Sequence, residues 1–348
     1  MRTVELRIPS PRQRSYPILI GAGAARELPR ILKDAKPSSM VVLCDAALRE
    51  IAEAVAKLTG AAGVIPVKTG EASKTMGEVE RIAAELQKLG TDRSTVLLCV
   101  GGGMLTDLGG FVAAIFLRGI RVIQVPTSML AMVDASVGGK TGVDLEHSKN
   151  IIGCIHHPLA VIADIDFLRT LPDTPLREGL VEAIKMAAIL DAGAFEWFEK
   201  HLAALLKRDP ETLAAAIESA VKMKAGTVGE DEREDGKRML LNFGHTVGHA
   251  AEALSGFAIP HGQAVSLGMM VEMRVAGTKG WERVEKLMKV MDMPLAIPQD
   301  QTNDALWQLM LRDKKTQGGV VRIAVPDRIG HGNVRPMTFE EFLAVRHG

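Results

Sequence analysis

Three histidines in the C-terminal half have a spacing that suits metal ligands. His245 and His249 are four residues apart, so a helix would place both imidazoles on one face, and His261 follows sixteen residues after His245. Zinc takes nitrogen, sulfur and carboxylate ligands and keeps an open position where it is catalytic. The motif HTVGH lacks the glutamate of HExxH and gives no support for peptide hydrolysis by that mechanism. The histidines could instead cap a helix or bind a substrate anion, and spacing alone does not say which two would hold a metal.

A second pattern suits a cofactor that carries phosphate. Gly101-Gly102-Gly103 follows an apolar run and precedes a helical pattern that contains Asp107. Glycines at such a turn let backbone N–H groups at a helix N-terminus approach a pyrophosphate. The run is not the GxGxxG fingerprint, so a purely structural turn is the alternative. Asp45 also ends an apolar run, where it could accept from a ribose hydroxyl or serve as a turn or cap residue.

Cationic side chains form a third pattern. Lys140 follows two glycines, and Lys149-Asn150 lies nine residues further on, which suits an anionic ligand. The spacing around Lys140 is wrong for a Walker A motif, and a solvated surface loop is the alternative. The acidic run 230–235 is typical of a solvated face.

Length and composition limit the class of protein. The chain has 348 residues, which suggests two domains, and its 47% hydrophobic and 24% charged residues are ordinary for a globular protein. Lys plus Arg (42) balance Asp plus Glu (42), and aromatic residues make up only 4%, so nucleic acid and anionic membranes are not expected partners. The longest apolar stretch, near 111–117, is far too short to span a bilayer.

The cysteines and the first residues indicate a reducing compartment. Cys44, Cys99 and Cys154 are far apart in apolar runs without a CxxC pair, so we expect reduced core thiols. Residues 1–6 alternate like a strand and lack the apolar region of a signal peptide. We therefore expect a cytoplasmic location.

The elements that would position these residues change in kind along the chain. Buried parallel strands are expected at 40–44, 95–100, 121–125 and 160–163, with an amphipathic helix at 73–89. Long helices are expected at 176–190, 210–224 and 263–275. The fold class that follows is α/β. A Rossmann-like, doubly wound domain (1–165) would precede a mainly α-helical domain (166–348), with the active site in the cleft between them.

Several ordered motifs together resemble the 3-dehydroquinate synthases, members of the sugar phosphate cyclases. The resemblance covers nearly the whole chain, and SVGGKTGV and NFGHTVGHA are its most specific parts. The matching segments are 70–74, 101–107, 117–119, 126–127, 133–143, 149–150, 171–172, 179–185, 231–234, 241–250, 261–262 and 313–315.

The resemblance implies a cofactor pair. A divalent metal, most often zinc with cobalt as the other candidate, would be held by Glu182, His245 and His261, while His249 would lie near the substrate phosphate. Two nitrogens and one carboxylate would leave positions open for substrate hydroxyls. The residues expected at NAD are Asp45, Glu71, Lys74, Gly102, Gly103, Asp107, Thr127, Ser128, Lys140, Lys149, Phe167 and Thr170.

It also implies a phosphorylated substrate, 3-deoxy-D-arabino-heptulosonate 7-phosphate. NAD would oxidise a ring hydroxyl, phosphate would be eliminated, the ketone would be reduced again, and an intramolecular aldol step would close the carbocycle. The phosphate candidates are His249, Lys140, Asn150, Asn242 and Arg118, of which Arg118 could reach across a homodimer. The other residues expected at the catalytic site are Lys185, Lys224, Arg238, Asp134, Glu234, Lys314 and Lys315.

The chain departs from the usual family pattern at Thr106, Asp144, Ser148 and Gln263, which stand where the family commonly has Gly, Asn, Gly and Glu. None of these is an assigned ligand or base, so tuning rather than loss of activity is expected. Three alternatives stay open: a related cyclase with another heptulose phosphate, a metal- and NAD-dependent polyol dehydrogenase, and an inactive relative that serves as a binding protein.

Overall fold

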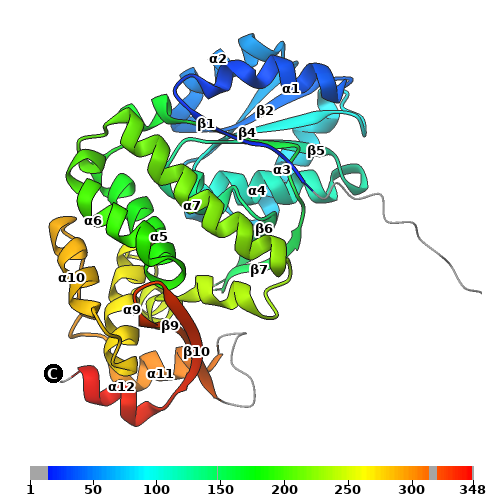
Figure 1. The fold of residues 1–348 in the computed structure, drawn as a ribbon. Coiled ribbons are helices and arrows are strands. Elements are labelled where there is room, and N and C mark those ends of the chain that lie inside the picture. Colours follow the sequence, from blue (N-terminus) through cyan, green and yellow to red (C-terminus); the bar gives the residue numbers. More distant parts are fainter. Residues whose placement is uncertain (1–14, 147, 313–319, 347–348) are drawn as a thin grey trace, which may run out of the picture.

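Short apolar runs that end in Asp, Gly or Pro form a six-stranded parallel sheet in the N-terminal half of the chain (Figure 1). The computed structural model describes residues 15–146, 148–312 and 320–346. The order across the sheet is β1-β8-β5-β4-β2-β3. Its strands are β1 (Ile18–Gly21), β2 (Met40–Asp45), β3 (Gly63–Val67), β4 (Val96–Gly101), β5 (Arg121–Pro126) and β8 (Ala160–Asp164).

Helices cover both faces of this sheet because successive strand residues point to opposite sides. Val41 and Leu43 of β2 belong to one apolar cluster with α3 and α4, whereas Val42 and Cys44 belong to another with α1 and α2. The expected doubly wound arrangement is confirmed. The helices are α1 (Leu28–Ala35), α2 (Arg49–Thr59), α3 (Met76–Lys88) and α4 (Gly103–Ile115).

The C-terminal half is mainly helical, as expected. Its helices are α5 (Asp173–Leu190), α6 (Ala192–Leu206), α7 (Pro210–Glu230), α8 (His245–Leu254), α9 (His261–Ala276), α10 (Trp281–Val290), α11 (Asn303–Arg312) and α12 (Phe339–Arg346). Their shared core extends back to Met129, Met132 and Val133 of the N-terminal half. The two halves are therefore packed together around η5 (Ala131–Ala135), a π-helical turn. The division into 1–165 and 166–348, with a cleft between the two parts, stays a prediction.

Two antiparallel hairpins correct the sequence-based expectations. Residues around Lys140 and Lys149 are not a pair of loops but a hairpin of β6 (Lys140–Leu145) and β7 (Ser148–Ile155). A second hairpin, β9 (Val321–Arg328) and β10 (His331–Met337), lies in the mainly helical half, where we predicted no particular strand.

The cysteine expectation is only partly correct. Cys44 and Cys99 are buried, but Cys154 is exposed, because it lies on the two-stranded hairpin rather than in the sheet. Across the described residues, every helix is too short or too polar to serve as a membrane span.

Candidate active site

The three histidines meet where α8 and α9 begin. The ring centroids of His245 and His249 are 4.9 Å apart, and that of His261 lies 5.3 Å from the first and 5.7 Å from the second. One ring nitrogen from each histidine lies within 4.8 Å of the other two. The three side chains can thus reach a common ligand.

Glycines bring the two helices into contact. A Cβ on Gly268 of α9 would lie 1.9 Å from the carbonyl oxygen of Gly244, and one on Gly248 of α8 would lie 2.6 Å from that of Ala264. Both distances are closer than a real Cβ allows. Glycine at these positions therefore lets α9 approach α8 closely enough for His261 to join the other histidines.

A buried carboxylate fixes the first turn of α8. Glu272 of α9 is fully buried and accepts hydrogen bonds from the backbone N–H groups of Gly244 (2.7 Å) and Val247 (3.0 Å). These donors belong to the helix start, where backbone N–H groups lack partners within the helix. Glu272 thereby sets the orientation of the turn that carries His245, and the sequence analysis did not find it.

The carboxylate of Glu182 on α5 faces His245 and His261. Its Oε1 lies 3.7 Å from His245 Nε2 and 3.5 Å from His261 Nε2, and its side chain has no exposed surface. Among the described residues, neither oxygen has a partner in hydrogen-bonding geometry, although Oε2 is 2.6 Å from Lys185 Nζ. Burial alone would raise the pKa of Glu182, but Lys185 and His261 outweigh burial and hold it below the ordinary value.

This donor set fits a divalent metal. A buried carboxylate oxygen without a hydrogen-bond donor and two imidazole nitrogens directed at it are the ligand types that zinc takes. Two sets of three ligands are available. His245 and His261 can be completed either by Glu182 or by His249. The geometry alone does not choose between Glu182 and His249 as the third ligand.

Buried lysines surround this cluster. Lys185 donates to the carbonyl oxygen of Leu241 at 2.6 Å, and Lys224 of α7 donates to Asp134 of η5 at its carbonyl oxygen (2.7 Å) and its Oδ1 (2.6 Å). Burial would raise the pKa of Asp134, but Lys224 and Lys185 hold it well below its usual range. Asp134 and Lys224 therefore join the two halves of the chain by an ion pair beside the histidines.

One carboxylate connects two of the expected phosphate ligands. Glu234 accepts a short hydrogen bond from Lys140 at Oε2 and one from Asn242 Nδ2 at Oε1 (2.5 Å). Glu234 has a φ of 67°, so its backbone is in the left-handed region. Arg238 lies beside this group and donates to the carbonyl oxygens of Glu232 (2.5 Å) and Gly138 (3.4 Å).

Most of the expected NAD residues lie at the carboxyl edge of the sheet, whereas Lys140 and Lys149 lie on the β6–β7 hairpin. β4 ends at Gly101 and α4 begins at Gly103, and the backbone N–H of Thr127, just beyond β5, donates to the carbonyl oxygen of Gly101. Ser128 lies against Gly102, where an added Cβ would be 3.4 Å from its Oγ. In open α/β sheets this edge is where ligands bind. Phe167 and Thr170 follow β8 at the same edge.

A buried ion pair supports the glycine turn. Lys74 is 2% exposed and donates to Asp107 Oδ2 (2.7 Å), to Glu71 Oε1 (3.4 Å) and to Asn150 Oδ1 (2.5 Å). The side chain of Asn150 therefore contacts the expected cofactor residues. Asp45 accepts from the Ala47 N–H at 2.9 Å and from Thr69, which is the turn and cap role considered above.

The remaining predicted residues lie apart from this group. Arg118 is exposed beyond the far end of α4, which at 1.5 Å per residue is roughly 20 Å from the glycine turn. Its role across a dimer stays a prediction. Lys314 and Lys315 lie outside the described residues.

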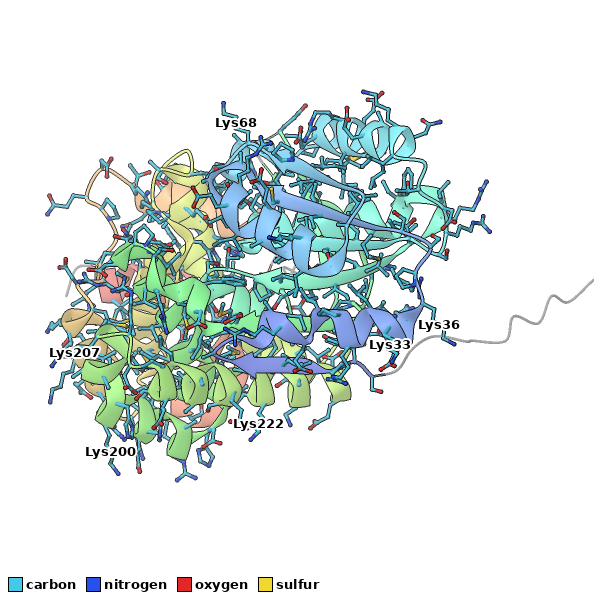
Figure 2. All side chains as sticks on the ribbon, turned by 90° about the horizontal axis from the view of Figure 1, so that it is seen from above. Lys33, Lys36, Lys68, Lys200, Lys207 and Lys222 are labelled. Atoms are coloured by element: carbon cyan, nitrogen blue, oxygen red, sulfur yellow. The ribbon has the colours of Figure 1, made fainter. Side chains whose placement is uncertain are left out.

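The lysines divide into an exposed set and a buried, ion-paired set. Figure 2 shows Lys33, Lys36, Lys68, Lys200, Lys207 and Lys222 at the periphery, where they point outward. Lys74, Lys185 and Lys224 are instead buried and converge on carboxylates near the histidines and the glycine turn. Each of these lysines is paired with a carboxylate, so an anionic ligand would have to compete with that carboxylate for it.

The fold and the site define a class of enzyme in which a nucleotide-binding type of parallel sheet is joined to a helical half with a carboxylate–histidine cluster. Family models for the N-terminal and C-terminal parts of 3-dehydroquinate synthase match residues 64–178 and 179–316. The 3-dehydroquinate synthase of Xylella fastidiosa (strain M23) is 39% identical over 97% of this chain and 95% of the relative. The chain belongs to the 3-dehydroquinate synthase family.

Solved structures of related cyclases share the fold. The 2-epi-5-epi-valiolone synthase of Streptomyces hygroscopicus subsp. jinggangensis 5008, solved with NAD+ and Zn2+ bound, is 26% identical, with a TM-score of 0.88 over 97% of this chain and 98% of that one. A 2-deoxy-scyllo-inosose synthase complexed with carbaglucose-6-phosphate, NAD+ and Co2+ is 24% identical, with a TM-score of 0.84 over 95% and 96%. At that identity, the second likeness supports the fold alone.

Proposed function

We propose that this chain catalyses the 3-dehydroquinate synthase reaction, which converts 3-deoxy-D-arabino-heptulosonate 7-phosphate into 3-dehydroquinate and phosphate. The observation that carries the proposal is the 39% identity to a curated synthase over 97% of this chain. The chemistry of the site agrees with it, because a buried carboxylate, three imidazoles and buried lysines suit a small polyanionic substrate.

Glu182, His245 and His261 would hold the metal, and His249 would face the substrate phosphate. Within the described part of the chain, Glu182 Oε1 has no donor in hydrogen-bonding geometry, which supports this ligand set. When bound, a divalent cation acts as a Lewis acid toward a substrate oxygen. Lys185 Nζ lies 2.6 Å from Glu182 Oε2 and balances the charge of this buried carboxylate, while Oε1 faces the two histidines.

The glycine turn at the start of α4 would bind the pyrophosphate of NAD. The backbone N–H groups of this turn and the helix N-terminus favour an anion. NAD supplies a hydride acceptor that is regenerated within each turnover. Asp107, oriented by Lys74 at 2.7 Å, would accept hydrogen bonds from the cofactor beside the turn.

Glu234 would hold the place of the substrate phosphate before substrate binds. Its two oxygens engage Lys140 and Asn242, which are both proposed phosphate ligands. A phosphate offers the same two donors more negative charge and more acceptor oxygens. Substrate would therefore take over both donors from Glu234.

The buried cations beside η5 would bind the substrate carboxylate and its hydroxyl groups. Lys224 is held by Asp134, and Arg238 is held by the backbone carbonyls of Glu232, in the acidic run 230–235, and of Gly138. This set favours a carboxylated heptulose phosphate over the carboxylate-free substrates of other cyclases. A homodimer to which Arg118 contributes across the interface, and a cytoplasmic location, belong to the same proposal.

Phosphate release from the heptulosonate phosphate tests the proposal. With NAD and Zn2+, the purified chain should release phosphate and form 3-dehydroquinate, and a strong chelator should stop both. A carboxylate-free heptulose phosphate should be a poor substrate. Turnover of that compound in preference to the carboxylated one would assign the chain to another cyclase activity.

Two lysines of α7 provide a matched pair for this assay. Lys224 is buried against Asp134, whereas Lys222 is 74% exposed and pairs with Glu218. Lys224→Met should abolish most phosphate release, and Lys222→Met should leave it near the wild-type rate. Equal rates for the two variants would remove Lys224 from the proposed substrate site.

A further inference from the structure

Glu252 lies on the face of α8 that carries the histidines but has no place in the site as described so far. It follows His249 by three residues and His245 by seven, so the three side chains share one face of the helix. Its side chain is 3% exposed. A carboxylate buried to this degree needs charged or hydrogen-bonding partners.

Two cationic groups, one from each half of the chain, face this carboxylate. Glu252 Oε2 lies 3.6 Å from His261 Nδ1, and Oε1 accepts from Lys149 Nζ of β7 at 2.6 Å. The other nitrogen of the same ring, His261 Nε2, faces Glu182 Oε1 at 3.5 Å. The imidazole of His261 is therefore held between two carboxylates, one at each nitrogen.

Glu252 and Lys149 form an ion pair beside His261. Lys149 Nζ, 2.6 Å from Oε1, pairs with Glu252 and favours its carboxylate form. Lys149 is also held over the ring of Phe257, 4.9 Å from its centroid. Lys149 thus fixes one oxygen of Glu252 and leaves the other directed at Nδ1.

We propose that Glu252 is a positioning residue for His261: with the metal bound, it accepts a hydrogen bond from Nδ1–H and so keeps Nε2, the ligand nitrogen, directed toward the metal and Glu182. A metal ligand that binds through one ring nitrogen is normally oriented by an acceptor at the other, and loss of that acceptor typically costs 10- to 100-fold in metal affinity. The inference rests on the proposed metal site and adds to it a residue that does not touch the metal.

Lys149 extends this role to the other half of the chain. It lies on the β6–β7 hairpin, next to Asn150, which contacts Lys74 beside the glycine turn. Side-chain contacts of the two neighbouring residues Lys149 and Asn150 therefore reach from Glu252 to the glycine turn. A purely structural ion pair between hairpin and helix is the competing explanation.

Zinc affinity of Glu252→Gln, measured by competition with a chromogenic chelator, tests the inference. We expect roughly 10- to 100-fold weaker binding, since the amide is a poorer acceptor of the Nδ1 proton. Glu178→Gln is the matched control, because Glu178 of α5 packs against Gly262, next to His261, and the variant removes the same charge. Its zinc affinity should stay close to that of the wild type, and a loss equal to that of Glu252→Gln would show a general charge effect instead.

Lys149→Met separates positioning from hairpin attachment. If Glu252 positions His261, Glu252→Gln should weaken zinc binding more than Lys149→Met does, and Glu252→Asp should recover part of the loss. Equal loss in the Gln and Met variants, without recovery by Asp, would overturn the inference. Histidine ¹⁵N spectra of the zinc-loaded wild type should show His261 bound through Nε2, with its proton on Nδ1. A wild-type chain that binds no zinc would overturn the proposed metal site itself.

Discussion

Removal of the Lys185 ammonium should lower the free energy of unfolding, and the loss should be larger without bound metal than with it. In the metal-free protein, Lys185→Met leaves Glu182 as a fully buried carboxylate without its ion-pair partner. Breaking such a pair costs about 3–5 kcal/mol. When a metal binds Glu182, the variant loses mainly the charged hydrogen bond to the Leu241 carbonyl, which contributes about 1.5–3 kcal/mol.

The difference between the stability losses of the metal-free and the metal-bound protein should equal the change in free energy of metal binding. About 1.5–2 kcal/mol separates the metal-free and metal-bound losses, so the variant should bind zinc roughly tenfold or more tightly than the wild type. Urea unfolding with zinc and with a chelator measures both losses. Lys224→Met is the control, because Lys224 pairs with Asp134 and its loss should not depend on zinc. Equal destabilisation of Lys185→Met with and without zinc would refute the assignment of Glu182 as a ligand.

Two further variants test the proposed ligand and cofactor sites. His249→Ala should keep zinc and NAD but lose turnover by roughly 10²- to 10⁴-fold, the range that positioned acid–base groups supply; metal analysis that finds an empty protein would make His249 a ligand. Asp107→Ala leaves Lys74 without its closest carboxylate and should weaken NAD binding in equilibrium dialysis while zinc affinity is unchanged; an unaltered NAD affinity would move the cofactor away from the α4 turn.

The sheet and the long helices could be predicted from the sequence because each depends on local pattern. Residues 40–44 and 95–100 are almost continuous apolar runs. Such a run is sufficient to predict a strand that is buried on both faces of a sheet. The β6–β7 hairpin could not be predicted in this way. Its residues at Gly142 and Gly153 face each other so closely that added Cβ atoms would meet the opposite backbone, which is a property of the pairing and not of either segment.

The candidate site could be predicted in part for the same reason. His245 and His249 share a helix face by spacing alone, whereas Glu182 entered only through the family resemblance. Glu252 has a recognisable signal, since it continues the face of His245 at a spacing of seven. Its partner Lys149 is 103 residues away, and Glu272 is 28 residues from the Gly244 N–H that it caps. Such partners depend on tertiary contacts, which a single sequence does not contain.

The ratio of phosphate released to NADH accumulated tests the central claim most directly. The assay supplies the heptulosonate phosphate, zinc and less than one equivalent of NAD, and follows phosphate and absorbance of NADH together. A synthase returns its hydride within each turnover, so phosphate should exceed the NAD present many times over while NADH does not accumulate. Accumulation of NADH in step with substrate consumed, without phosphate, would contradict the account and identify a dehydrogenase.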